Sequence, residues 1–175
     1  MVETNGRNFD LLTLGQVLLR LSPTDNERLS RGDTFVKQVG GAELNVAVGA
    51  ALLGLHTGVI SKLPAHDIGS FMKGKIRSFG VSDDFFMYDQ SPAARVGIYY
   101  YENGAYPRKP KVIYDRNHSS FFSLDIDEIP EEVYTASKCF HTTGITLALN
   151  EDIRETTIEM IKRFKAAGTL VSFEV

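Results

Sequence analysis

The sequence is poor in cysteine and in long apolar runs, and each shortage excludes a class of protein. Its single cysteine, Cys139, excludes an internal disulfide framework and favours a reducing compartment. No apolar run approaches the roughly 20 residues that a membrane-spanning helix needs. Residues 1–8 also lack the apolar core of a signal peptide. We therefore expect a cytoplasmic protein that does not enter a membrane.

The sequence also lacks a large excess of one charge. Its 19 Lys and Arg against 22 Asp and Glu leave a net charge of −3, which offers no basic field for nucleic acid or an anionic membrane. The four histidines show no metal-ligand spacing, so no metal site is predicted. Neither a Walker loop nor the G-x-G-x-x-G fingerprint is present, which ranks a dinucleotide-dependent oxidoreductase last.

What is there instead is a pair of glycines, Gly40 and Gly41, that leads directly into a small, apolar helix. Glycines let a ligand approach the main chain, and a helix N-terminus presents unpaired N–H groups. Asn45 adds an acceptor and two donors at the same end. The alternative interpretation is a tight turn before a core helix that is buried on all sides, and the glycine pair alone favours that alternative.

Strands alternate with helices along most of the chain, and this order predicts a parallel, helix-covered sheet. In such a sheet ligands gather at the carboxyl ends of the strands. Gly15 and Gly144 follow two of the predicted strands at that edge. The predicted strands are 10–14, 17–21, 30–39, 57–63, 85–88, 138–143 and 169–175, and the helices follow Gly41, Asp67 and Asn150.

Residues 95–101 and 111–116 are predicted to form an antiparallel pair. Alternation places Tyr99 on the opposite face from Ile98, and it places Tyr114 and Arg116 together on one face of the second strand. Tyrosines would then lie on one face and aliphatic side chains on the other. We expect one face to cover a ligand and the other to meet a partner subunit.

Several motifs in one order resemble the ribokinase-like (PfkB) sugar kinases. The first signature of that family is similar to Gly40-Gly41-Ala42-Glu43-Leu44-Asn45-Val46-Ala47, followed by Leu53-Gly54 and Ser61-Lys62-Leu63-Pro64. Further stretches resemble the 2-keto-3-deoxygluconate kinase branch: residues 14–23, 96–100, 111–116 and 140–146. The resemblance runs in order from Phe9 to Val175.

The resemblance implies a fold and a domain plan. The fold would be the helix-covered, mostly parallel α/β sheet of the ribokinase fold, incomplete here, with a small β-sheet lid. Residues 1–175 would form the N-terminal part of one domain, with lid strands inserted at about 17–39 and 93–118. The protein would be a homo-oligomer, a dimer, that associates through the lid sheet.

The resemblance also implies an activity. The full-length protein would phosphorylate a sugar acid with ATP, converting 2-keto-3-deoxygluconate into its 6-phosphate. The family's catalytic aspartate, in a Gly-Ala-Gly-Asp motif, would lie beyond residue 175, as would the site for ATP and Mg²⁺. This chain would then hold no catalytic residue, no cofactor site and no metal site, and it would be inactive alone.

The resemblance assigns substrate contacts to individual residues of this chain. Arg116 is the candidate for charge recognition, because its planar fork can pair bidentately with a carboxylate. The alternative is a solvated arginine that pairs with Asp115 or Asp125. The residues that match the family's substrate-binding positions are Gly40, Gly41, Asn45, Tyr99, Tyr114, Arg116 and the main chain of Ile145.

One departure from the family bears on the substrate. The family usually has Glu after the glycine that ends the first strand, and this chain has Gln16, which removes a charge from the edge of the pocket. Two other functions stay open: a kinase for a neutral sugar of the fructose or ribose type, and a non-catalytic sugar-binding module.

Overall fold

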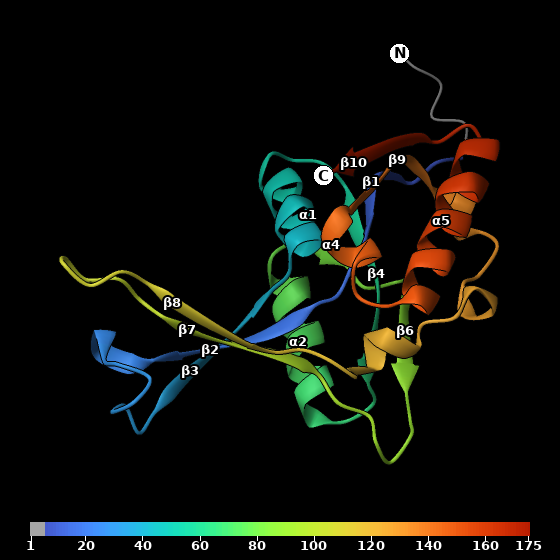
Figure 1. The fold of residues 1–175 in the computed structure, drawn as a ribbon. Coiled ribbons are helices and arrows are strands. Elements are labelled where there is room, and N and C mark those ends of the chain that lie inside the picture. Colours follow the sequence, from blue (N-terminus) through green and yellow to red (C-terminus); the bar gives the residue numbers. More distant parts are fainter. Residues whose placement is uncertain (1–5) are drawn as a thin grey trace.

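The structure, a computed structural model, describes residues 6–175 and contains two sheets (Figure 1). The larger sheet is parallel, with the order β10-β9-β1-β4-β5, and β6 also pairs with β4. Its strands are β1 (Phe9–Leu14), β4 (Thr57–Pro64), β5 (Val81–Ser82), β6 (Phe86–Asp89), β9 (Ser137–Thr143) and β10 (Leu170–Glu174). The predicted parallel α/β sheet is therefore confirmed.

Helices cover both faces of this sheet (Figure 1). On one face, α1 (Ala42–Leu52) and α2 (Asp67–Ser78) bury Leu44, Met72 and Ile76 in one apolar cluster. On the other face, α5 (Glu151–Ala166) buries Met160 and Phe164 in a second cluster. Burial of these side chains is the main free-energy gain of the fold. Two short helices, α3 (Val133–Ala136) and α4 (Gly144–Leu147), and three 3-10 turns, η1 (Thr24–Asn26), η2 (Ser120–Ser123) and η3 (Ile126–Glu128), complete the described elements.

The smaller sheet, which we call the lid, extends away from the larger one (Figure 1). It has the order β3-β2-β7-β8. Its strands are β2 (Leu18–Pro23), β3 (Phe35–Gly40), β7 (Gly97–Glu102) and β8 (Lys111–Asp115). The antiparallel register pairs Tyr99 with Tyr114 and Tyr100 with Ile113, which confirms the predicted separation of the two lid faces.

Two expectations about local structure are wrong. The third predicted strand begins at Phe35 rather than Ser30, because the chain first turns where the N–H groups of Arg31 and Gly32 both donate to the carbonyl of Arg28. The helix after Gly41 is not buried on all sides: Leu52 is 78% exposed and Leu53 is 85% exposed. Among residues 6–175 no element covers this outer face of α1.

The other helix boundaries follow the sequence closely. The Asn150 side chain accepts a hydrogen bond from the backbone N–H of Ile153 at 2.8 Å, as expected of a residue that caps a helix. Gly168 follows the end of α5 with a φ of +76°. Within the described part of the chain, no helix has the length and apolar character needed to cross a membrane.

Candidate functional site

The glycine pair lies where the lid joins the larger sheet, and both positions exclude a side chain. Gly41 caps the N-terminus of α1 with a φ of +148°, a conformation that L residues rarely adopt. A Cβ at Gly41 would lie 2.7 Å from the main-chain oxygen of Gln16, and a Cβ at Gly40 would lie 2.5 Å from the hydroxyl of Tyr99. The missing side chains therefore let Tyr99 and Gln16 pack closely against the main chain at the start of α1.

The predicted lid residues lie together on one face. The rings of Tyr99 and Tyr114 are 5.9 Å apart, and the Arg116 guanidinium lies 5.7 Å from the centre of the Tyr114 ring. Burial raises the pKa of Tyr99 above 10.0, although the nearby Arg20 opposes this effect. Tyr99 is thus a neutral hydroxyl at physiological pH, able both to donate and to accept a hydrogen bond.

Arg116 is half-buried, and its partner is an amide rather than a carboxylate. Its Nε donates to Oε1 of Gln16 at 2.7 Å. Burial lowers the pKa of the Arg116 guanidinium from its usual value, while Tyr114 and Glu43 act in the opposite direction, and the side chain stays charged. The alternative pairing is wrong: Asp115 forms its ion pair with Arg95 at 2.9 Å, and Asp125 accepts from the N–H of Asp127.

Ile145 is tied to the glycine pair through a buried carboxylate, Glu43, which is only 2% exposed. Oε1 of Glu43 accepts hydrogen bonds from the hydroxyls of Thr143 at 2.6 Å and Thr146 at 2.7 Å. These two threonines flank Ile145 in sequence. The first turn of α1 therefore holds in place the segment that carries the Ile145 main chain.

The structure thus links five of the seven predicted residues, Gly40, Gly41, Tyr99, Tyr114 and Arg116, through direct contacts or one shared neighbour. It links Ile145 to them only through the threonines that bond to Glu43. Asn45 lies one turn into α1 with an exposed side chain, and no hydrogen bond within residues 6–175 joins that side chain to the other six. Sequence reasoning placed Gln16 at the edge of the pocket without giving it a contact, and it did not assign Glu43 to the site. One signal was available for Glu43, a lone charge within an apolar helix.

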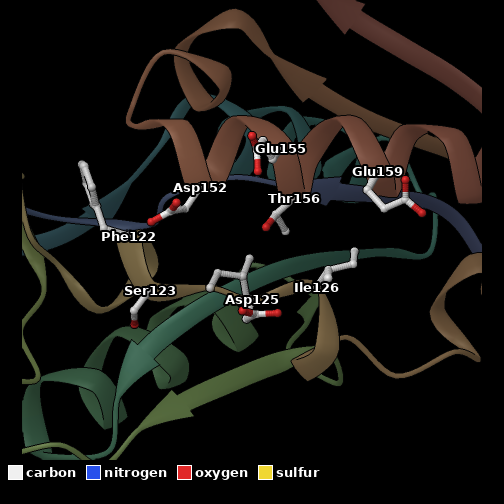
Figure 2. A pocket seen from close by; sticks show the side chains of 9 residues that line it. Phe122, Ser123, Asp125, Ile126, Asp152, Glu155, Thr156 and Glu159 are labelled. Atoms are coloured by element: carbon white, nitrogen blue, oxygen red, sulfur yellow. The ribbon is translucent and has the colours of Figure 1, made fainter.

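A separate cavity of about 350 Å³ lies between α5 and the segment that contains η2 and η3 (Figure 2). Four carboxylates line it, those of Asp125, Asp152, Glu155 and Glu159, and they would repel an anionic ligand. None of the seven predicted residues lines this cavity. It is therefore not the site that the motifs predict.

Within residues 6–175, no three His, Cys, Asp or Glu side chains come together in a way that could hold a metal ion. The arrangement around Arg116 and Gly41 offers a positive charge and free N–H donors that can orient a small polar anion.

Comparison with known proteins identifies a family for this chain. The profile of the pfkB family of carbohydrate kinases matches residues 8–173. A 2-dehydro-3-deoxygalactonokinase of Haloferax volcanii is 37% identical over 166 residues, which cover 95% of this chain and 51% of that protein. A 5-dehydro-2-deoxygluconokinase of Clostridium botulinum is 30% identical over 97% of this chain and 49% of its own length.

A solved structure of a sugar-acid kinase has a similar fold over the matched residues. The crystal structure of 2-dehydro-3-deoxygluconokinase from Thermotoga maritima superimposes with a TM-score of 0.88 at 34% identity, covering 94% of this chain and 50% of that one. The chain therefore spans about half the length of the relatives that it matches.

Proposed function

Because the chain belongs to the pfkB family of carbohydrate kinases, we propose that its full-length protein phosphorylates a 2-keto-3-deoxy sugar acid at the terminal hydroxyl. The leading substrate is 2-keto-3-deoxygluconate, converted into its 6-phosphate. Family membership implies ATP as the phosphoryl donor, and Mg²⁺ is part of the proposal. This chain would supply the sugar-binding half, as the N-terminal part of one ribokinase-like domain. A cytoplasmic location completes the proposal.

The observation that carries the proposal is Arg116, a half-buried guanidinium that forms no ion pair among residues 6–175. It lies beside Tyr114 and is held by a neutral amide, and the buried Glu43 attracts it from beyond ion-pair distance. A half-buried cation whose Nη atoms make no hydrogen bond among these residues favours an anionic ligand, and a planar fork suits a carboxylate. A neutral sugar would give this cation no ion-pair partner.

The proposed contacts follow from the geometry. Arg116 would bind the carboxylate, while Tyr99 and Tyr114 would bind hydroxyl or keto oxygens from the lid. Gly40, Gly41 and Asn45 would contact the sugar from the start of α1, and the main chain of Ile145 would close the opposite side. The names of all three relatives above describe kinases of deoxygenated, oxidised sugar acids, which supports this class of substrate.

The test is ATP-dependent phosphorylation by the full-length protein, measured with 2-keto-3-deoxygluconate, 2-keto-3-deoxygalactonate, 5-dehydro-2-deoxygluconate, fructose and ribose. We expect the highest kcat/KM for 2-keto-3-deoxygluconate. Replacing Arg116 with Ala should lower kcat/KM for the acid by about 100-fold, because a charge-assisted bidentate contact is lost. The same change should lower it less than about threefold for a neutral sugar.

The other candidate functions give different outcomes in the same assay. A neutral-sugar kinase would prefer fructose or ribose and would tolerate Arg116→Ala. A non-catalytic module would bind a sugar without turnover by the full-length protein. Unchanged affinity for the sugar acid in Arg116→Ala would contradict the proposed role of the arginine.

A further inference from the structure

Gln16 holds both the backbone and the side chain of Arg116. It lies between β1 and β2 and is 2% exposed. Its Nε2 donates to the main-chain oxygen of Arg116 at 3.0 Å and to Oγ of Ser119 at 2.7 Å, while its Oε1 accepts from Nε of Arg116 at 2.7 Å. Both amide hydrogens and the amide oxygen are therefore in use.

The surroundings of Gln16 leave room for this amide and little else. A Cβ at Gly97, on the adjacent β7, would lie 2.7 Å from Nε2 of Gln16. A Cβ at Gly41 would likewise lie too close to Gln16, 2.7 Å from its main-chain oxygen. One residue thus connects the start of α1, the lid strand β7 and Arg116, three elements that are far apart in sequence.

The contacts determine which edge of the guanidinium remains available. Nε is engaged by Gln16, and neither Nη1 nor Nη2 of Arg116 makes a hydrogen bond within residues 6–175. The Nη1–Nη2 edge is the fork that can meet a carboxylate with two parallel bonds. A neutral amide fixes this orientation without neutralising the positive charge.

A glutamate at position 16 could not do the same. Its carboxylate could accept from Nε of Arg116, but an oxygen would replace the amide nitrogen that donates to the Arg116 carbonyl 3.0 Å away. Two acceptor oxygens, with no hydrogen between them, would then face each other in a buried region. The added negative charge would also pair with the guanidinium and reduce its attraction for an anionic ligand.

We propose that Gln16 is a positioning residue that presents the Nη edge of Arg116, with its charge intact, to the carboxylate of the substrate. Gln16 therefore contributes to specificity for acids over neutral sugars without touching the substrate. This inference rests on the proposed function, since it requires a substrate that carries a carboxylate.

The test compares variants of the full-length protein: Gln16→Met, which keeps the volume and removes the hydrogen bonds, Gln16→Glu, and Arg116→Ala. KM and kcat are measured with 2-keto-3-deoxygluconate and with fructose. We expect Gln16→Met and Gln16→Glu each to raise KM for the acid by about tenfold, with kcat within about threefold of the parent and KM for fructose unchanged. Gln90→Met makes the same change at an exposed position and should leave KM for the acid unchanged.

A double-mutant cycle separates positioning from a general structural role. If Gln16 acts through Arg116, adding Gln16→Met to Arg116→Ala should raise KM for the acid no further. Independent, multiplicative effects would overturn the inference, and so would an unchanged KM in Gln16→Met. A parent protein that does not phosphorylate the acid, or an Arg116→Ala variant with normal KM, would instead contradict the proposed function itself. Thermal unfolding of every variant identifies any loss of fold.

Discussion

At the scale of single residues, the site depends on glycines whose missing Cβ atoms leave room for neighbouring polar groups. Gly15 is the tightest of these positions: a Cβ there would lie 2.1 Å from Oε2 of Glu43. Glu43 in turn accepts from Thr143 and Thr146. A methyl group at position 15 would displace a buried carboxylate from two of its donors, at a cost in both packing and hydrogen bonding.

Replacing Gly15 with Ala should therefore lower the free energy of unfolding by about 3 kcal/mol, measured by urea denaturation of the full-length protein. It should also weaken sugar binding, because Glu43 would no longer hold the segment around Ile145. Gly74→Ala is the matched control, since Gly74 is an exposed helical glycine with open space at its Cβ. That control should gain about 0.5–1 kcal/mol. Equal stability of the two variants would contradict the packing argument.

At the scale of elements, α2 is connected to the strand that follows it by ion pairs with one buried carboxylate, that of Asp83. Asp83 comes directly after β5 and meets Lys73 at 3.1 Å and Arg77 at 2.5 Å, both from α2. Burial alone would raise the pKa of Asp83, but the two cations outweigh it and lower the pKa below 3.8. The carboxylate therefore stabilises the fold above the pKa of its unfolded state, and this contribution is lost as the pH falls through the folded-state pKa.

Asp83→Asn should accordingly cost about 1–2 kcal/mol of unfolding free energy at pH 7, with the difference from the parent shrinking as the pH approaches 3. Urea denaturation at several pH values provides the measurement. Asp84→Asn, at the adjacent exposed position, should show neither the cost nor the pH dependence. A constant difference between Asp83→Asn and the parent from pH 7 to pH 3 would show that the ion pairs do not stabilise the fold.

The lid is the element that we propose joins two copies of the protein. Its aliphatic face carries an exposed apolar cluster of Phe35, Tyr100 and Ile113, with Phe35 40% exposed and its ring 6.1 Å from that of Tyr100. Tyr99 and Tyr114, which we propose contact the substrate, lie on the opposite face. An apolar cluster on a projecting sheet is suited to association with a second copy.

We expect a dimer of the full-length protein by light scattering, and Ile113→Asp should shift it towards monomer by burying an unpaired charge at the interface. Val112→Asp is the control, because Val112 is similarly exposed but lies on the opposite lid face. A monomeric parent protein would contradict the proposed dimer. Equal effects of the two variants would contradict the assignment of the face.

At the scale of the whole molecule, residues 6–175 expose two apolar surfaces besides the lid cluster. The outer face of α1 exposes Leu52 and Leu53, and the edge strand β10 exposes Leu170 and Phe173. Within residues 6–175, β10 pairs only with β9, so its other edge presents free backbone donors and acceptors. Such an edge readily pairs with another chain.

Expressed alone, residues 1–175 should therefore self-associate, with apparent mass rising with concentration in analytical ultracentrifugation. They should also show no phosphoryl transfer from ATP to 2-keto-3-deoxygluconate, because in the proposed division the reacting half belongs to the rest of the full-length protein. The full-length protein, assayed in parallel, is the control. Turnover by the 175-residue chain would contradict the proposed division between a sugar-binding half and a reacting half.

Much of the fold could be predicted from periodicity and turn residues, since both depend on neighbours close in sequence. Alternation placed Tyr99 and Tyr114 on one lid face, and Asn150 marked the start of α5, as the structure confirms. The exposed outer face of α1 could not be predicted this way, because an apolar pattern indicates that a face can be buried without identifying what covers it.

The sequence by itself determined the order of the predicted strands and helices, the glycine turn before α1 and the pairing of β7 with β8, because backbone sterics and side-chain alternation act locally. Only the tertiary structure decided the partner of Arg116, which is Gln16 rather than Asp115 or Asp125. It also decided that Glu43 holds Thr143 and Thr146. These contacts join residues about 100 positions apart. Packing in three dimensions selects such partners, so they cannot be predicted from the spacing of residues along the chain.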